Sequence, residues 1–572
     1  EMPGAPDDRE DGDQVHILPL DGGEARRLTD LPRGVTGFAW SPDGRTIAAL
    51  SASRGDTREA DARRRGMPVK RPAPDAPPES DYRYLDRLSY MLNGSGFIEG
   101  REPDIWLVEV ESGAARRLTR GGTPVTGPAW SPDGTRIAFA TDRRPDRDRQ
   151  WHSQVYVVDV GTGRETRITD TGNSWFSEPA WLPDGRSLAA LGHRFPAAAG
   201  SRNDIWLFAA DGSESGPGAG RNLSGEHDLM PGASMTSDIT PHEDPHLAVT
   251  GDGRWITFTA PYGGSYELWR IATDDGSLVR LTEDRHYISA FDQVGLSGGA
   301  SEATGGGRRR GKAARGGRAG GPSRIAYVRS AGDALPDVWS LDVPAGDAGA
   351  SPSTPKRLTD LNADALADVE LVRPVERWVT VDGLSVQGWY VGPASPAGSD
   401  GSDRKERRGS RRPAAPRRTP LVTEIHGGPH TLYGWSPVWE FQVLAGAGIG
   451  VWYSNPRGSE GYGQAFNAAN FRDWGPGPTR DVLAGIEALV EEGYADPARL
   501  GVTGGSYGGY LTNWIVGHDR RFAAAMTCRS VVDLTSQFLS GDIAGPAFGQ
   551  LEFGVTPWED PAFYRDHSPL TY

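Results

Sequence analysis

The stretch Leu500-Gly-Val-Thr503-Gly504-Gly505-Ser506-Tyr507-Gly508-Gly509 decides the fold of the last third of this chain. It begins with a short apolar strand and runs directly into the pattern Gly504-x-Ser506-x-Gly508, after which residues 510–516 are expected to be helical. A serine in this context lies on a strained turn from strand to helix, and the flanking glycines allow the two elements to approach closely. The sequence therefore predicts that Ser506 is a nucleophile.

A second copy of the pattern, Gly295-Leu296-Ser297-Gly298-Gly299, competes with the first. We expect no strand before this copy, and it opens a segment that has too little apolar surface to order itself. In a chain with 77 glycines the pattern alone is weak evidence. The surrounding sequence therefore decides, and it favours Ser506 over Ser297.

Upstream of Ser506, short apolar segments alternate between strand and helix. A strand pair is expected over 378–381 and 386–391, single strands over 421–425 and 450–453, and a helix over 480–493. This alternation is typical of a mostly parallel sheet, and with the serine turn it predicts an α/β-hydrolase domain over residues 374–572, truncated before its last strands. The loop His426-Gly-Gly-Pro429 matches the one that supplies an oxyanion N–H in such hydrolases, and Tyr507 supplies the other. We interpret His426 as a residue that shapes this loop.

Residues 1–373 carry internal repeats. In one element a β-rich run is followed by a Leu-Thr pair or its equivalent, as in Asp104 to Val110 with Leu118-Thr119. Further copies end at Thr29, Thr169, Ser224, Thr282 and Thr359. The second element is a tryptophan before a Pro-Asp-Gly turn, at Trp40, Trp130 and Trp181, with a degenerate copy at Thr250-Gly-Asp-Gly253. Thr119, Thr169, Ser224 and Thr282 recur every 50–58 residues, which suits four-stranded blades and predicts an N-terminal β-propeller; a sandwich of stacked hairpins is the alternative.

Three segments interrupt these patterns. Residues 52–82 are charged and proline-rich, and we expect a loop insertion in one blade. Residues 297–323 are rich in Gly, Ala and Arg, and residues 394–420 are rich in Ser, Pro and Arg. Because neither composition can bury enough apolar surface to fold, we expect disordered insertions in the propeller and in the hydrolase domain, respectively.

The combined motifs resemble the prolyl oligopeptidase family of serine peptidases. The resemblance is carried by Gly504-Gly-Ser-Tyr-Gly-Gly-Tyr510, His426-Gly-Gly-Pro429 and Asn455-Pro-Arg-Gly-Ser-Glu-Gly-Tyr-Gly463; the last of these and the Trp-Ser-Pro-Asp-Gly turns are most similar to the acylaminoacyl-peptidase branch. The resemblance implies a serine peptidase that hydrolyses short peptides through an acyl-enzyme on Ser506, as an acylaminoacyl- or dipeptidyl-type exopeptidase or oligopeptidase. It also implies that the backbone N–H groups of Tyr507 and Gly428 form the oxyanion hole, that the propeller gates access, and that no cofactor is needed.

The triad is where this chain departs from the family pattern. In the family the nucleophile is followed by an aspartate and then a histidine, each on a loop after a later strand, but this chain ends at Tyr572. None of the candidates present follows such a strand; they are Asp533, Asp542, Asp560, Asp566, His518 and His567. We therefore expect the triad Asp and His to lie outside this chain. We interpret the chain as a fragment that lacks both natural ends and is inactive as it stands.

The segment His242-Glu243-Asp244-Pro245-His246 matches the zinc-binding pattern His-Glu-x-x-His. That chemistry needs both histidines on one face of a helix. Pro245 inside the motif would clash with the preceding helical turn. We therefore predict an inter-strand loop and no metal site.

Composition narrows the remaining options. The net charge of −15 argues against a nucleic-acid binder, and no apolar run is long enough to cross a membrane. Cys528 is the only cysteine, which fits the cytoplasm, although a chain that begins with Glu1 does not reveal whether a signal peptide precedes it. The oligomeric state stays open, a homo-oligomer included. Two other functions remain: a serine esterase or amidase on the same fold, and a propeller binding module with an inert hydrolase remnant.

Overall fold

The computed structural model describes residues 12–31, 33–52, 85, 88, 90–92, 96–98, 102–120, 122–169, 172–216, 218–240, 245–295, 322–345, 351–393, 418–543 and 546–572. The predicted insertions 52–82, 297–323 and 394–420 lie outside these residues except at their ends, where residues 52, 323 and 419–420 belong to strands. The chain divides into two compact units, Glu1–Arg194 with Trp206–Arg221 and Leu539–Phe548, and Phe195–Ile205 with Asn222–Phe538 and Gly549–Tyr572. The predicted domain boundary between residues 373 and 374 stays a prediction.

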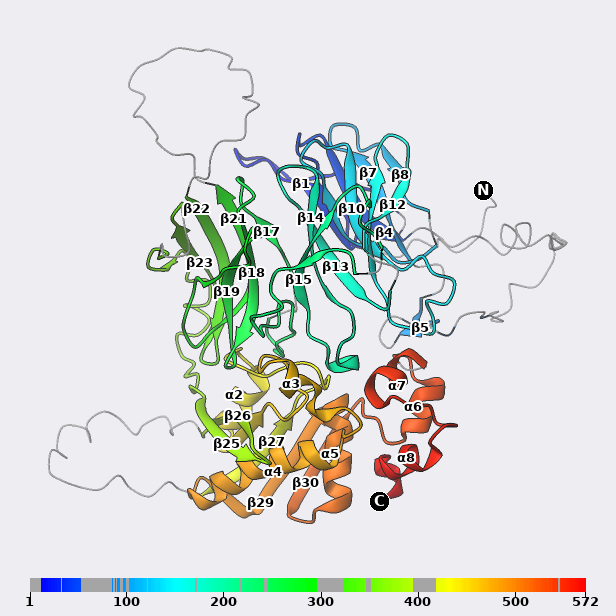
Figure 1. Ribbon diagram of the computed structural model, residues 1–572. Coiled ribbons are helices and arrows are strands. Elements are labelled where there is room, and N and C mark those ends of the chain that lie inside the picture. Colours follow the sequence, from blue (N-terminus) through cyan, green and yellow to red (C-terminus); the bar gives the residue numbers. More distant parts are fainter. Residues whose placement is uncertain are drawn as a thin grey trace, which may run out of the picture. The chain divides into compact units, whose positions relative to one another are not determined.

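The N-terminal strands form small antiparallel sheets (Figure 1). One contains β3 (Gly37–Trp40), β4 (Thr46–Ala52), β7 (Pro103–Glu109) and β8 (Ala115–Arg117), and a second contains β9 (Thr126–Trp130), β10 (Arg136–Thr141), β11 (Gln154–Asp159) and β12 (Glu165–Arg167). A third contains β13 (Trp175–Trp181), β14 (Ser187–His193), β15 (Asp204–Ala209) and β16 (Arg221–Asn222). The short strands β1 (His16–Ile17) and β2 (Arg26–Arg27) pair, as do β5 (Met91–Leu92) and β6 (Gly96–Phe97).

The next eight strands are connected as one sheet. They are β17 (Ala248–Val249), β18 (Trp255–Tyr262), β19 (Ser265–Ala272), β20 (Leu278–Arg280), β21 (Tyr287–Gly295), β22 (Ser323–Ala331), β23 (Ala334–Val343) and β24 (Lys356–Arg357). A single parallel pair, Tyr266 with Tyr287, joins β19 to β21, whereas all other pairings are antiparallel. The sheet thus consists of two antiparallel four-strand sets in chain order.

The Leu-Thr repeat has a structural cause that recurs in every copy. The Thr29 hydroxyl accepts a hydrogen bond from the Val15 backbone N–H at 2.9 Å and donates to the Gln14 side chain. The same N–H to hydroxyl bond joins Ile105 to Thr119, Val155 to Thr169, Ile205 to Ser224, Leu268 to Thr282 and Val338 to Thr359. Because these hydroxyls are mostly buried, each bond satisfies a polar group that would otherwise be costly to bury.

The tryptophan-containing repeats form a tight turn, and two of their tryptophans donate a hydrogen bond to the preceding sheet. In the first copy Ser41 donates to Asp43 and accepts from the Thr46 N–H at 2.9 Å, while Gly44 has the positive φ of 68° that the turn requires. The indole N–H of Trp130 donates to the Ala39 carbonyl at 3.1 Å, and that of Trp181 to the Ala129 carbonyl at 3.0 Å. Each tryptophan therefore links its own sheet to the sheet before it.

The C-terminal part contains a six-stranded sheet in the order β25-β26-β28-β27-β29-β30. Its strands are β25 (Val375–Val381), β26 (Leu384–Val391), β27 (Thr419–Ile425), β28 (Gly450–Ser454), β29 (Ala495–Gly505) and β30 (Phe522–Cys528). β27 is parallel to β28 and β29, and β29 is parallel to β30, whereas β26 is antiparallel to both of its neighbours. The predicted strands over 378–381, 386–391, 421–425 and 450–453 are thereby confirmed.

Helices cover this sheet on both faces (Figure 1). α4 (Pro476–Glu491) and α5 (Tyr507–His518) contact each other and the parallel strands, and α2 (Trp439–Gly446) contacts β26 and β28. Successive side chains of β28 point to opposite faces of the sheet. Trp452 packs against Gly485 of α4, where a Cβ would clash with its ring, and Tyr453 stacks on Phe441 of α2. Shorter helices follow: α3 (Gln464–Asn467), α6 (Leu534–Ser540), α7 (Pro546–Phe553) and α8 (Pro561–Asp566).

Two expectations need correction. The helix predicted over 480–493 begins earlier, at Pro476, because proline at the first helical turn has its φ already set for a helix. A strand does precede Ser297, since β21 ends at Gly295. β21 pairs antiparallel with β22, whereas β29, which precedes Ser506, is parallel to both of its neighbours. Ser297 itself lies outside the described residues.

Candidate active site

Ser506 lies on the turn between β29 and α5. Its backbone has φ 58° and ψ −119°, a conformation that non-glycine residues rarely adopt and that costs on the order of 1–3 kcal/mol. The turn is held from both sides: the Ser506 N–H donates to the Cys528 carbonyl, and the Tyr510 N–H donates to the Ser506 carbonyl, both at 2.9 Å. Ser506 is exposed, although Gly504 and Tyr507 on either side are buried. The strained turn therefore presents this serine to solvent.

The glycines of the turn cannot be replaced by larger residues without a steric clash. A Cβ on Gly504 would lie 2.6 Å from the Ile425 carbonyl oxygen, and a Cβ on Gly508 would lie 2.0 Å from the same atom. A Cβ on Gly509 would lie 2.6 Å from the Cβ of Ser530. Helix α5 can thus approach the ends of β27 and β30 only because these positions lack side chains.

The loop after β27 lies against this turn. A Cβ on Gly427 would be 3.5 Å from the Ser506 Cβ, so the two segments are in van der Waals range. Gly428, the next residue, has a φ of 114° that favours glycine. On the other side of Ser506, Tyr507 is the first residue of α5, and the N–H groups of a first helical turn have no partner within the helix. The loop and the helix N-terminus therefore converge on Ser506.

His426 is engaged by its own loop. Its Nε2 lies 2.9 Å from Ser459 Oγ, and its Nδ1 lies 2.7 Å from the Gly427 carbonyl oxygen and 3.0 Å from Thr431 Oγ1. Burial lowers the pKa of His426 to about 4, so the ring is neutral at physiological pH. These contacts are those of a residue that shapes the loop.

His430, which follows the loop, was not among the residues predicted for the site. Its Nδ1 lies 3.0 Å from the Gly458 carbonyl oxygen and 2.8 Å from Asn467 Oδ1, and its Nε2 forms a 3.3 Å ion pair with Glu552. Burial disfavours its charged form, but the carboxylate of Glu552 and the bond to Asn467 outweigh burial and raise the pKa of His430 to about 9. The ring therefore carries a positive charge beside a buried carboxylate.

Glu552 and Trp474 were also missed. The Trp474 indole N–H donates to Glu552 Oε2 at 2.9 Å, and its ring meets that of Tyr507 edge to face with centroids 5.2 Å apart. The Tyr507 hydroxyl in turn donates to the Trp474 carbonyl at 2.8 Å. No local motif marks these residues, because their partners lie far away in the sequence. Phe553, which also packs on Trp474, belongs to this aromatic cluster.

The Asn455-Pro-Arg-Gly-Ser459 segment packs against the loop after β27 and holds it in place. The guanidinium of Arg457 binds both carboxylate oxygens of the fully buried Asp481, at 2.8 and 2.7 Å, and also reaches Asp382. Asn455 bonds to the backbone of Tyr433 in both directions. Because this segment supplies the Gly458 carbonyl and the Ser459 hydroxyl to His430 and His426, it fixes both histidines.

Within the part of the chain that the structure describes, no histidine or carboxylate bonds to Ser506 Oγ. His518 ends the twelve-residue helix that Ser506 begins, which places it roughly 18 Å away at 1.5 Å per residue. Its Nδ1 bonds to the Trp514 carbonyl, and that of His567 bonds to the Phe563 carbonyl. The described residues therefore bring the serine together with the two segments predicted to carry the oxyanion donors, without an acid–base pair.

Two further features are the His-Glu-x-x-His pattern and a surface hollow. Residues 242–244 of the His-Glu-x-x-His pattern lie outside the described residues, and among those described no cluster of His, Cys, Asp and Glu could hold a metal ion.

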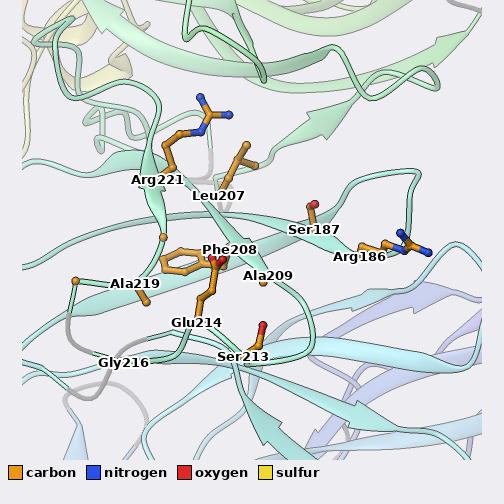
Figure 2. Close-up of a pocket in the computed structure, with 12 residues that line it drawn as sticks. Arg186, Ser187, Leu207, Phe208, Ala209, Ser213, Glu214, Gly216, Ala219 and Arg221 are labelled. Atoms are coloured by element: carbon orange, nitrogen blue, oxygen red, sulfur yellow. The ribbon is translucent and has the colours of Figure 1, made fainter.

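A surface hollow of about 780 Å³ lies along β14 and β15 and the loop after β15 (Figure 2). Phe208 lies at its centre, and Arg186 and Arg221 point away from that ring. Its lining includes neither Ser506 nor any residue of the six-stranded sheet.

No described helix has both the length and the apolar character needed to span a bilayer.

Comparisons with known proteins address the family and the fold of this chain. The sequence profile of the prolyl oligopeptidase family matches residues 435–572, and that of the TolB β-propeller domain matches residues 94–203. The uncharacterized peptidase YuxL of Bacillus subtilis is 30% identical over 575 residues, covering 99% of this chain and 76% of that protein. Dipeptidyl-peptidase 5 of Porphyromonas endodontalis is 24% identical, covering 95% of this chain and 69% of that protein.

The fold has solved counterparts. The acylaminoacyl peptidase of Pyrococcus horikoshii aligns with a TM-score of 0.69 at 21% identity, covering 98% of this chain and 73% of that one. The predicted fold class, a β-propeller followed by an α/β-hydrolase domain, is confirmed. The profile matches and the relative at 30% identity establish what the motifs around Ser506 indicated: this chain belongs to the prolyl oligopeptidase family and is a serine-type peptidase.

Proposed function

We propose that this protein cleaves short peptides as an acylaminoacyl- or dipeptidyl-type exopeptidase or oligopeptidase, with Ser506 as the nucleophile. One observation carries the proposal: an exposed serine at positive φ begins helix α5 while the Gly427-Gly428 loop lies against it. A backbone strained in this way persists only where the surrounding structure holds it, as β29, β30 and the glycines do here. The strain is therefore an argument for a catalytic role.

The proposed chemistry is acyl transfer. Ser506 Oγ attacks the peptide carbonyl, whose oxygen becomes negative and accepts hydrogen bonds from the backbone N–H groups of Tyr507 and Gly428. Each such donor is worth on the order of 10²–10³ in rate, and the positive end of the α5 dipole adds to the same stabilisation. The amine leaves with the proton that Oγ gave to a histidine base, and water then releases the acyl group.

We further propose that the base and its aspartate partner are not among His518, His567, Asp533, Asp542, Asp560 and Asp566. The two histidines bond to carbonyls of their own helical turns, and His518 lies at the far end of α5. Replacing either histidine by alanine in the natural protein should leave peptide turnover per folded molecule unchanged. Loss of turnover with normal folding would assign that histidine to the triad.

The substrate class follows from the relatives. A structural counterpart is named acylaminoacyl peptidase, and a sequence relative is named dipeptidyl-peptidase 5. A propeller that gates access would restrict substrates to short peptides. We therefore expect short peptides that carry either a blocked or a free N-terminus to be cleaved near that end.

The test uses the natural protein with a fluorophosphonate probe and a paired set of substrates. Ser506→Ala should lose probe labelling and peptide turnover, whereas Ser297→Ala should retain both. Turnover of acyl-amino-acid amides is then compared with that of dipeptidyl amides and of simple p-nitrophenyl esters. Ester hydrolysis without amide hydrolysis would point to an esterase, and an unlabelled, inactive protein would point to a binding module with an inert hydrolase remnant.

A further inference from the structure

A buried ion pair connects the two segments that carry the proposed oxyanion donors. His430 lies two residues after Gly428, and its ring is fixed by the Gly458 carbonyl and Asn467 on one side and by Glu552 on the other. Glu552, on α7, is only 3% exposed. The loop that carries Gly428 is thus attached to a helix that is remote from it in the sequence.

The hydrogen bonds define the protonation state of His430. A carbonyl oxygen can only accept, so Nδ1, which lies 3.0 Å from the Gly458 oxygen, carries a hydrogen. In a neutral ring Nε2 would then present its lone pair to a carboxylate oxygen at 3.3 Å, and the two acceptors would repel. The doubly protonated ring removes this repulsion and pairs with the buried carboxylate.

Glu552 is also connected, through Trp474, to Tyr507, which carries the second proposed oxyanion donor. Its other oxygen accepts the Trp474 indole N–H at 2.9 Å, and Trp474 accepts the Tyr507 hydroxyl at its carbonyl. Trp474 is 2% exposed and Tyr507 is 2% exposed, so this contact is shielded from water. Glu552 therefore connects the Gly428 loop, through His430, to the start of α5, through Trp474.

We propose that His430 and Glu552 are positioning residues: their ion pair sets the spacing between the Gly428 and Tyr507 N–H groups and so tunes the oxyanion hole. The inference rests on the function proposed above. Neither residue touches the reacting atoms; each acts through the backbone segment that it holds. An oxyanion hole depends on such placement, because its donors must lie within hydrogen-bonding distance of the developing charge.

The charges around His430 determine the expected pH dependence. Glu552 faces it from α7 and Glu460 from the loop after β28, and both favour the charged ring; His426, on its own loop, is neutral. The folded-state pKa of about 9 is above the value for a free histidine. The His430 ring therefore stays charged in the folded protein until the pH approaches about 9 and loses its proton as the pH rises through that value, which predicts an alkaline decline of kcat. The stability that this charge contributes is fully present below about pH 6.5, the pKa of a free histidine, and is lost as the pH rises through about 9.

Two isosteric variants test this inference in the natural protein. His430→Asn keeps an N–H where Nδ1 lies but removes the charge, and Glu552→Gln keeps an acceptor for Trp474 but removes the negative charge. Each should lower kcat roughly 10- to 100-fold, less than the loss of an entire donor, while KM stays within about twofold. In Glu552→Gln the alkaline decline should move to lower pH, because the charge that raises the pKa of His430 is gone.

A second buried histidine–glutamate pair provides the matched control. His286 Nε2 lies 2.8 Å from Glu267 Oε2 in the propeller, and the other bonds of Glu267 go to Thr282, Arg280 and the Asp284 N–H of the same sheet region. His286→Asn should lower the melting temperature without changing kcat per active site or the alkaline decline. It therefore separates the effect of losing a buried pair from an effect on the oxyanion hole.

Active sites are counted by fluorophosphonate titration, so that poorly folded variants do not mimic slow ones. If His430→Asn and Glu552→Gln melt earlier but keep kcat per labelled site and the alkaline decline of the parent, the pair is merely structural and the inference is overturned. If Ser506→Ala keeps its turnover, the proposed function itself fails. The two failures are distinguished because the first leaves the dependence on Ser506 intact.

Discussion

Replacing Gly508 by alanine should disable the nucleophile turn although alanine is the better helix former. Gly508 is the second residue of α5, where the substitution alone would be worth up to about 1 kcal/mol in favour of the helix. The new Cβ, however, would lie 2.0 Å from the Ile425 carbonyl oxygen and 2.8 Å from that of His426. Both atoms belong to backbone that cannot rotate aside, so helix and strand must separate.

The size of the effect follows from these distances. Ordinary van der Waals contact begins at 3.4 Å, so the helix start must move more than 1 Å from the end of β27. Inserting a methyl group into a packed site typically costs about 1–3 kcal/mol. Gly446, near the end of α2, has nothing within 4 Å of its Cβ position, and alanine there should stabilise by about 0.4–1 kcal/mol. We expect the two variants to differ by about 1.4–4 kcal/mol in unfolding free energy.

The assay combines denaturant unfolding of both variants with the rate at which a fluorophosphonate labels Ser506. Because Ile425 leads directly into the loop that carries Gly428, Gly508→Ala should also slow labelling by at least about tenfold, since that reaction uses the same oxyanion donors. Gly446→Ala should label at the parent rate. A Gly508→Ala protein as stable and as reactive as Gly446→Ala would refute the steric reasoning.

Three further outcomes are expected. Ser506→Ala should abolish fluorophosphonate labelling of the natural protein, as measured by gel fluorescence, while Ser297→Ala labels normally. Deleting residues 297–321 or 394–417, which keeps the starts of β22 and β27, should change the melting temperature and peptide turnover little; a collapse of either would show that the segment is structural. Burial, aided by the charge of Glu440, raises the pKa of Glu424 to about 8, so its ionisation in the folded state costs stability as the pH rises from about 4.5 through 8. Glu424→Gln should therefore be more stable than the parent at pH 9, with the difference in melting temperature vanishing near pH 5; a difference independent of pH would contradict this.

The fold was predictable from the sequence where a motif forms its hydrogen bonds or its turn with residues nearby in the sequence. The Leu-Thr pairs are visible in the sequence because each hydroxyl must close a hydrogen bond near its own strand, about 14 residues earlier in the case of Val15 and Thr29. The same holds for Asp382-Gly383, where both residues adopt positive φ and turn β25 back onto β26. Such features need no knowledge of the remaining chain, so their spacing alone reveals them.

The candidate site was predictable only in part. Ser506 and the glycines around it form one continuous motif, whereas His430, Trp474 and Glu552 are ordinary residues until the fold brings them together. A histidine after a glycine-rich loop and a glutamate in a short helix carry no spacing that relates one to the other. The roles proposed for Ser506, Tyr507 and Gly428, the location in the cytoplasm and the oligomeric state stay predictions.

The two Gly-x-Ser-x-Gly copies show why strand direction, more than the presence of a strand, distinguishes a nucleophile turn. Both copies follow a strand, β21 for Ser297 and β29 for Ser506. β29 is parallel to both of its neighbours, so the chain must return across the sheet, and α5 provides that crossover with its N-terminus at the carboxyl edge beside β27. β21 is antiparallel to β22, so that pair of strands requires no crossover helix between them. A positive helix end and a neighbouring loop that reaches the serine follow from parallel pairing, and Ser506 has both.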